Sequence, residues 1–289
     1  MLVSMVTVGL LGAVAFQQTD TVVPMRPGAR LEISNFAGNV VVRTWPRDEM
    51  RIVADHSRRT VVDISRSGSS VRLRAQARAG PASVDYEITV PASIDVDVKG
   101  TLTSADIDGV EGEITVETTQ GDIAVVGGRG FVSLQTTQGD VDLEGAEGRV
   151  DVSSSQGGIR ITGASGSVYA ETVTGTITLE DVTSSSVDAK TTSGSVYYDG
   201  TIEDGGLYSL GTHSGDVTVV LPEGSNVTAS VSTFSGEFAS AFPVTVTEAL
   251  TRGGRFTFTI GSGLARLELA SFSGNIELRR RGDRGRIRR

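Results

Sequence analysis

The feature that most constrains this chain is a short phrase that returns at a fixed spacing between residues 104 and 199. Its copies are TTQGDIAV, TTQGDVDL, SSQGGIRI, TVTGTITL and TTSGSVYY. Their glycines are Gly121, Gly139, Gly157, Gly175 and Gly194, which lie 18, 18, 18 and 19 residues apart. A fainter set lies midway, at Gly112, Gly130, Gly148 and Gly166, so the underlying period is nine. A short period in a chain rich in β-branched residues is typical of a solenoid, in which each coil stacks on the preceding one.

Each nine-residue unit carries apolar residues at the second and fourth positions after its glycine. Examples are Ile123 and Val125, Val141 and Leu143, Ile159 and Ile161, and Ile177 and Leu179. Alternation with period two predicts a strand with one buried face, and the glycine allows a turn or a close backbone approach that a side chain would obstruct. Two units are therefore expected to make a coil of about 18 residues, which needs neighbouring coils to complete its core.

The rest of the chain extends this architecture in both directions. Strand-like runs between residues 30 and 100 lack the period, and we expect them to form an antiparallel β cap before solenoid repeats at 101–278. Beyond Tyr198 the glycines Gly215, Gly236 and Gly274 follow at spacings of 21, 21 and 38, and the last predicts two coils of about 19 residues. No stretch has helical periodicity. The expected fold class is all-β: a single-chain solenoid resembling a right-handed parallel β-helix.

The N-terminus indicates export. Leu2 to Phe16 is apolar, and Ala13-Val14-Ala15 has the form of a signal-peptidase site, so residues 1–15 are expected to be a cleaved signal peptide and 16–29 a linker. An uncleaved anchor is the alternative, although the run is short for a membrane span. The chain has no cysteine, which excludes disulfides, cysteine-ligated zinc and thiol catalysis.

Charge is distributed unevenly along the chain. The segment 279–289 has seven arginines and one aspartate, and we expect it to be a basic, disordered tail. Residues 26–78 carry eleven arginines and five acids, whereas residues 79–278 carry eight cations and 28 acids. An acidic rod between two basic ends favours attraction between ends and middle, within or between molecules.

Three segments together resemble a known family. The run LEISNFAGNVVV, the segment VDYEITVP and the repeated TTSGD-like phrases look like the bacterial putative-adhesin β-solenoid family, a domain of unknown function that is similar to autotransporter-type adhesin head domains. The resemblance covers about residues 30–278. It implies an exported, non-enzymatic β-solenoid, and it brings neither catalytic residues nor cofactors to this sequence.

Calcium-binding β-rolls share the 18-residue coil, so the aspartates after the glycines require a comparison with them. Asp122 and Asp140 would stack on adjacent coils, where carboxylates of neighbouring turns could share an ion. The equivalent positions on later coils are Gly158, Thr176 and Ser195, which interrupt the ladder. We therefore expect solvated turns here and no metal site.

One charged cluster deserves consideration as a site. Asp140, Asp142 and Glu144 are expected to project outward beside Arg160 of the next coil, and paired carboxylates with a base are what a polysaccharide lyase or hydrolase needs. The alternative is a charged outer face with a cross-strand pair between Asp142 and Arg160. His56 and His213 have no partner motif nearby, so no catalytic residues are assigned and we predict that the protein is not an enzyme.

Aromatic and hydroxyl side chains recur on the predicted coils. Tyr169, Tyr197 and Tyr198 could stack on sugars or on a partner, although Tyr169 and Tyr197 belong to opposite half-coils and could instead fill wider coils. A hydroxyl residue lies three positions before most glycines, where it could stabilise turns or form a binding surface. These residues are Thr118, Thr136, Ser154, Thr172, Thr191 and Thr212.

The sequence therefore predicts an exported, non-enzymatic, adhesin-like binding module located in the periplasm, on the cell surface or outside the cell. Its candidate surface-binding residues are Asp140, Asp142, Glu144, Arg160, Tyr169, Tyr197 and Tyr198. Expected partners are an envelope polysaccharide or another envelope protein, with the basic tail contacting an anionic polymer or lipid, and no nucleic acid. The alternatives are a scaffold that self-associates or binds a signalling partner, and a carbohydrate-active enzyme.

Overall fold

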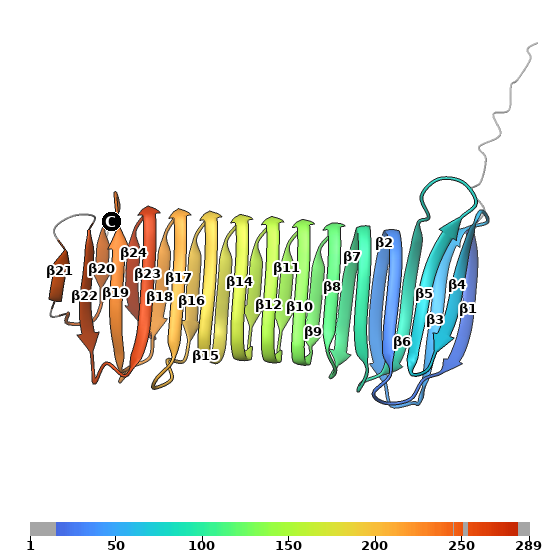
Figure 1. The fold of residues 1–289 in the computed structure, drawn as a ribbon, viewed down its shortest axis with the longest axis horizontal. Coiled ribbons are helices and arrows are strands. Elements are labelled where there is room, and N and C mark those ends of the chain that lie inside the picture. The colour runs from blue at the N-terminus through green and yellow to red at the C-terminus, as the bar shows by residue number, and fades with distance from the viewer. Residues whose placement is uncertain (1–15, 245, 251–253, 283–289) are drawn as a thin grey trace, which may run out of the picture.

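The computed structural model of the chain describes residues 16–244, 246–250 and 254–282. All 24 strands in these ranges belong to one sheet, and most of its pairs are parallel. Figure 1 shows the strands side by side in an elongated rod, with the blue N-terminal strands at one end and the orange and red C-terminal strands at the other. Within the described ranges, no helix is long and apolar enough to cross a membrane. The prediction of an all-β fold is confirmed.

In the middle of the rod each coil contributes one longer and one shorter strand. The longer strands are β8 (Ile114–Gln120), β10 (Arg129–Gln138), β12 (Glu147–Gln156), β14 (Ser165–Thr174) and the second part of β15 (Ile177–Ser193). The shorter ones are β9 (Ile123–Gly127), β11 (Val141–Glu144), β13 (Ile159–Thr162), the first part of β15 and β16 (Val196–Gly200). Like strands pair in parallel, and partners such as Val132 and Val150 are 18 residues apart. The rod therefore has a long-strand face and a short-strand face.

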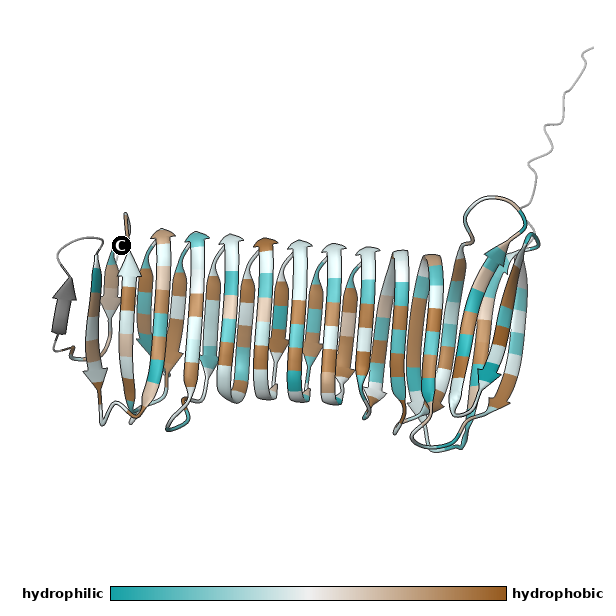
Figure 2. Ribbon diagram, in the orientation of Figure 1, coloured by the Kyte–Doolittle hydropathy of each residue, from teal (hydrophilic) through white to brown (hydrophobic). Residues whose placement is uncertain are grey.

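The core lies between these two faces. Val132 and Leu134 point inward from the long-strand face, Val141 and Leu143 point inward from the other, and all four are buried. Figure 2 shows the resulting alternation of brown and teal bands along the strands. Because each coil supplies only a few apolar residues, the core is thin and continues from coil to coil.

The turns are held by the residues of the repeated phrase. The Thr136 hydroxyl donates to the carbonyl of Gly121 over 3.1 Å, and the Thr172 hydroxyl donates to that of Gly157 over 3.0 Å. Thr118, Ser154, Thr191, Thr212, Thr233 and Ser271 donate to the preceding coil in the same way. Most of these hydroxyl residues are buried, so the ladder stabilises turns and does not form an outer surface.

The aspartates after the glycines have a structural role as well. Asp122 accepts the backbone N–H of Asp140 over 2.9 Å, and Asp140 accepts that of Gly158 over 2.7 Å. Each carboxylate thus caps the next coil. Among the described residues no group of three or more His, Cys, Asp or Glu side chains is placed to hold a metal ion.

The N-terminal end differs from the expected antiparallel cap at residues 30–100. β2 (Arg30–Trp45) pairs in parallel with β7 (Asp95–Val110) along both halves, so it is itself a coil of the solenoid. Its other edge pairs in parallel with β5 (Ser70–Ala77) and β6 (Val84–Pro91). Only the outermost pairs are antiparallel. The expected boundary at residue 100 also falls inside β7, because the phrase NFAGNVVV already builds a coil before the chain turns back to cover it.

The expected linker at residues 16–29 is corrected too. Residues Phe16–Pro24 form β1, which pairs antiparallel with β3 (Glu49–Ser57). Likewise β3 pairs antiparallel with β6, and β4 (Thr60–Ser67) with β5. Val23 is buried and an ion pair joins Asp20 to Arg51 at 2.7 Å, so β1 closes the cap. The expected signal peptide at 1–15 lies outside the described residues.

The C-terminal end is not stacked in sequence order. β17 (Leu207–Ser214) and β18 (Val217–Leu221) pair in parallel with β23 (Ala265–Ser273) and β24 (Ile276–Arg280). The earlier strands β19 (Val227–Thr233) and β20 (Phe238–Ser240) pair with the far side of β23 and β24. β22 (Arg255–Ile260) and β21 (Val246–Leu250) follow antiparallel. The last coil of the chain is therefore inserted between two earlier ones.

This insertion overturns the spacing argument for Gly274. The Ser271 hydroxyl donates to the carbonyl of Gly215, and Asn275 N donates to Asp216 over 2.7 Å, across 59 residues of sequence. Gly236 lies beyond Gly274, not two coils before it. The expected tail also begins later than Arg279, because β24 includes Arg280. Residues 283–289 of that tail lie outside the described residues.

Candidate functional site

The long-strand face carries a row of outward residues that runs from coil to coil along the rod. Neighbours in this row, which we call the axial row, are paired in register. In spatial order the row consists of Lys99, Glu117, Gln135, Ser153, Glu171, Lys190, Gly211, Ala270, Ser232 and Arg255. Most members have polar side chains of some length. Gly211 on β17 and Ala270 on β23 leave the row nearly bare at two adjacent positions.

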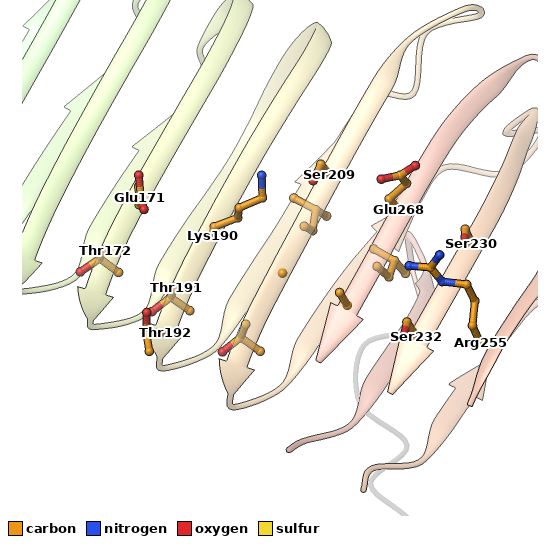
Figure 3. Close-up of a pocket in the computed structure, with 15 residues that line it drawn as sticks. Glu171, Thr172, Lys190, Thr191, Thr192, Ser209, Ser230, Ser232, Arg255 and Glu268 are labelled. Atoms are coloured by element: carbon orange, nitrogen blue, oxygen red, sulfur yellow. The ribbon is translucent and has the colours of Figure 1, made fainter. Parts of the chain in front are cut away.

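A groove of about 430 Å³ opens where the axial row is bare. Figure 3 shows it flanked by Lys190 on one side and Arg255 on the other. The strand pairing places Gly211 and Ala270 between them. Hydroxyl groups line it from several strands; they belong to Thr192, Ser209, Ser230 and Ser232. Lys190 and Arg255 are four strand spacings apart along the row, or roughly 19 Å. The groove is therefore long enough for an extended ligand that crosses the strands.

The charges at the Lys190 end are already partly satisfied within the protein. Lys190 Nζ lies 2.8 Å from Asp188, and the Tyr169 hydroxyl donates to Glu171. This hydrogen bond, together with partial burial, raises the pKa of Tyr169 to about 12. The phenol thus stays protonated near neutral pH and holds the Glu171 carboxylate at the rim.

The opposite end of the groove carries one charge of each sign. Arg255 and Glu268 are exposed, and neither makes an ion pair or a side-chain hydrogen bond with any residue whose side chain the structure describes. A guanidinium offers several donors in a planar fork, and a carboxylate offers only acceptors. This end of the groove can therefore bind a carboxylate or phosphate and a hydroxyl or amine of the same ligand.

A stack of three aromatic rings lies at the corner beside the groove. His213 and Phe272 have ring centroids 4.7 Å apart, and Phe272 and Phe234 follow at 4.8 Å. Phe272 and Phe234 are 48% and 71% exposed. They come from the THSG, SFSG and TFSG copies of the turn phrase, which the insertion of β23 brings into consecutive coils. The corner gives the polar groove an apolar rim.

The predicted charged cluster lies on the other face. Arg160 lies 3.1 Å from Glu180 and 3.8 Å from Asp142, and the side chains are more than one-third exposed. Asp140 and Arg160 line a smaller hollow of about 350 Å³, but Asp140 is bonded to the backbone of Gly158. Glu144 lies two residues after Asp142 on β11, and its side chain is exposed. This arrangement fits the alternative of a charged outer face better than an acid–base pair, because the one cation is shared between two carboxylates.

The three predicted tyrosines do not form one platform. Tyr198 is fully buried, and its hydroxyl donates to the carbonyl of Thr201 over 2.7 Å, so its assignment as a surface-binding residue is wrong. It packs edge-on against buried Tyr208, as expected for a side chain that fills a wider coil. Tyr197 is half-buried on the short-strand face. Only Tyr169 lies on the long-strand face, next to the groove.

The two histidines take no part in an acid–base assembly with each other. His56 is buried in the cap, with Nε2 3.0 Å from the Thr19 hydroxyl and Nδ1 2.9 Å from the carbonyl of Ser57. Because a carbonyl oxygen only accepts, the Nδ1 atom is the donor in the contact with Ser57. His213 lies in the aromatic stack near the opposite end of the rod.

A family model described as Toastrack DUF4097 matches residues 29–279 of the chain. The chain belongs to this family. The resemblance to a putative-adhesin domain of unknown function, drawn from LEISNFAGNVVV and the later phrases, is thereby confirmed. No curated protein matches the sequence.

Several solved structures are similar to this Toastrack chain over most of its length. A putative adhesin from Bacteroides fragilis NCTC 9343 is 10% identical with a TM-score of 0.47, and covers 91% of this chain and 97% of its own. A putative adhesin from Parabacteroides distasonis ATCC 8503 is 9% identical with a TM-score of 0.37, covering 90% and 97%. A putative cell adhesion protein from Clostridium sporogenes ATCC 15579 is 9% identical with a TM-score of 0.23, covering 92% and 100%. Because the TM-scores and sequence identities are this low, these structures give no information about the groove or its ligand.

Sequence reasoning missed the groove of this Toastrack chain, although one signal was present. The phrases AKTTSG, LGTHSG and LASFSG place Lys190, Gly211 and Ala270 at the same position before the glycine. The loss of a side chain at two of these positions could have been noticed. The adjacency of the coils that carry Gly211 and Ala270 could not have been noticed, because β19 to β22 separate them in the sequence.

Proposed function

We propose that this Toastrack chain is an exported, non-enzymatic binding module of the cell envelope or cell surface, and that the groove on its long-strand face is the binding site. The observation that carries the proposal is the interruption of the axial row at Gly211 and Ala270. Elsewhere along this row, polar side chains cover the strands. At the interruption, backbone and hydroxyl groups are accessible between two cations.

The chemistry of the groove supports a polar, extended ligand. Its hydroxyl groups can donate or accept, and Arg255 and Glu268 offer one charge of each sign. The exposed rings of Phe272 and Phe234 add apolar contact at the rim. An envelope polysaccharide or an extended segment of an envelope protein has this combination of properties, and either is the partner class that we propose.

The handedness of the solenoid, its coil length, its cap and the location of the protein are also part of this proposal. We infer a right-handed solenoid of about 18 residues per coil with a mixed N-terminal cap, supported by the 18-residue offsets between paired strands. Export is supported by the apolar run Leu2 to Phe16. The location is the periplasm, the cell surface or the medium.

The test fills the groove without straining the backbone. Gly211 does not have a positive φ, and a Cβ there would meet nothing closer than 3.7 Å, so Gly211→Gln is sterically allowed. Gln135 shows that the axial row accepts this side chain. The matched control is Ser153→Gln, at the equivalent position on β12 outside the groove. Each full-length variant is cosedimented with purified cell-wall and envelope fractions at low and high salt.

We expect Gly211→Gln to weaken saturable, salt-resistant retention about tenfold or more, which corresponds to the loss of about 1.4 kcal/mol. Ser153→Gln should bind like the natural chain. Equal retention of all three proteins, or retention that disappears entirely in high salt, would show that the groove is not the binding site.

A further inference from the structure

Three arginines lie together at the outer corner of the cap. Arg58 and Arg59 form the turn between β3 and β4, and Arg78 directly follows β5. The backbone N–H of Arg78 donates to the carbonyl of Arg59 over 2.9 Å, which places the two residues side by side. All three are exposed, and none makes an ion pair or side-chain hydrogen bond with a described residue. We call this group the arginine pole.

The apolar N-terminal run joins the fold at the same corner. Phe16, the first residue of β1, lies opposite Ser57, the residue that precedes Arg58. Residues 1–15 contain no charged side chain and are mostly apolar. Phe16, to which this run is bonded, therefore lies next to the arginine pole.

The rod between the two basic ends of the chain has the opposite charge. Residues 79–278 contain eight cations and 28 acids, and most cations of the middle coils are already paired; examples are Arg129 with Glu147 at 3.0 Å and Arg160 with Glu180 at 3.1 Å. An anionic surface would therefore attract the pole and repel the rod. The charge distribution therefore favours contact through an end of the rod over contact along its side.

We propose that the arginine pole docks on the anionic headgroups of a lipid bilayer. The guanidinium groups bind headgroup phosphates, and the acidic rod projects from the contact. Gly211, the first bare position of the groove, lies on β17, eight strand spacings along the rod from β5, or roughly 38 Å away. The pole and the groove lie toward opposite ends of the rod (Figure 1). The docking is independent of what the groove binds, so either can fail without the other.

The experiment compares three variants, each of which loses a net charge of three from a different part of the molecule. The pole variant carries Arg58→Gln, Arg59→Gln and Arg78→Gln. The rod control carries Arg129→Gln, Arg149→Gln and Arg160→Gln. The tail control ends after Gly282 and loses four arginines and one aspartate, so all three variants lower the net charge by three.

Partition of each full-length protein is measured by flotation with phosphatidylcholine vesicles, with and without phosphatidylglycerol. The ratio of the two partition coefficients reports charge-dependent docking and cancels any contribution of the apolar run. Circular dichroism and thermal melting check that each variant folds.

We expect the natural chain, the rod control and the tail control to prefer phosphatidylglycerol vesicles. Each basic residue near an anionic surface contributes about a fivefold preference, so the pole variant should lose about a hundredfold. Added salt should reduce the preference. The proposal is overturned if the natural chain has no preference for anionic vesicles, if the tail control loses the preference while the pole variant keeps it, or if all three variants lose it equally.

Discussion

At the scale of single residues, each position of the repeated phrase has one physical task. The hydroxyl before the glycine donates to the preceding coil, an aspartate after it caps the following coil, and the glycine lets the two backbones approach. The candidate groove arises at a position outside this set, where an outward side chain is absent at Gly211 and Ala270. Positions that build the solenoid and positions free to bind are thus separate.

The glycine position gives a direct test of this division. Gly139 has φ +151°, and a Cβ there would overlap the carbonyl oxygen of Gly121. We expect Gly139→Ala to lower the free energy of unfolding by at least about 3 kcal/mol, because backbone strain and steric overlap add.

The matched control for this substitution is Gly145→Ala. Gly145 has φ +71° with no atom within 4 Å of its Cβ position, so only conformational strain of about 1 kcal/mol is expected. Urea unfolding measures both. Equal losses would mean that close approach of the backbones does not set the glycine requirement.

At the scale of elements, the stacking order departs from the sequence order at both ends of the rod. β2 lies between β7 and the pair β5 and β6, although it precedes all three in the chain. β23 lies between β17 and β19, and β24 lies between β18 and β20. In both places, a segment that stacks out of sequence order covers a sheet edge. That edge would stay open if the coils stacked in the order of the sequence.

The inserted position of β23 predicts its dynamics. Terminal segments usually exchange their amide hydrogens quickly, but β23 has a hydrogen-bonded neighbour on each side. We expect the amides of β23 to exchange as slowly as those of β12 in the middle of the rod, and those of edge strand β4 to exchange faster. Hydrogen–deuterium exchange with mass spectrometry checks this, and fast exchange of β23 would contradict the inserted arrangement.

At the scale of the whole molecule, a thin core makes the few large buried side chains important. Tyr86, Tyr198 and Tyr208 are among the largest fully buried residues. Burial is the main cause that raises the pKa of each phenol above its usual value. The folded protein therefore keeps these three protons at a pH where the unfolded chain releases them.

This retention predicts a loss of stability in alkali. Because the folded pKa values are raised, the stabilisation is complete below the unfolded pKa of about 10 and falls as the pH rises above it. Three tyrosines give a slope of up to about 4 kcal/mol per pH unit. The pKa of Tyr169 is also raised, to about 12, and that of Tyr197 is raised as well, so both phenols add to this slope.

Urea unfolding as a function of pH measures this slope, and tyrosinate absorbance reports when the phenols ionise. Tyr86→Phe should lower the slope by up to about 1.4 kcal/mol per pH unit, because one of the retained protons is removed. A slope that does not change in this variant would show that Tyr86 ionises in the folded state.

The repeat determined the architecture without help from tertiary structure. Alternation of apolar residues around Val141 and Leu143 assigns strands and their inward faces, and the 18-residue spacing of the phrase anticipates the offset between Val132 and Val150. These features are local, and the same sequence signal is repeated in every coil. The inward position of Tyr198 follows from the same alternation, because Tyr198 is the fourth residue after Gly194, so placing it on the surface overlooked a signal that the repeat carries.

Only the tertiary structure decided which coils are neighbours at the ends of the rod, and with that the candidate groove. Any coil of this kind offers the same backbone hydrogen bonds to any other, so the repeat does not specify the order in which coils stack. The order depends on how far the connections between β18 and β23 reach, and on the packing of Phe238, Phe256 and Phe258 at the closed end. The sequence therefore determined the coil by itself, whereas the juxtaposition of Gly211 with Ala270 and Arg255 depends on contacts between distant segments.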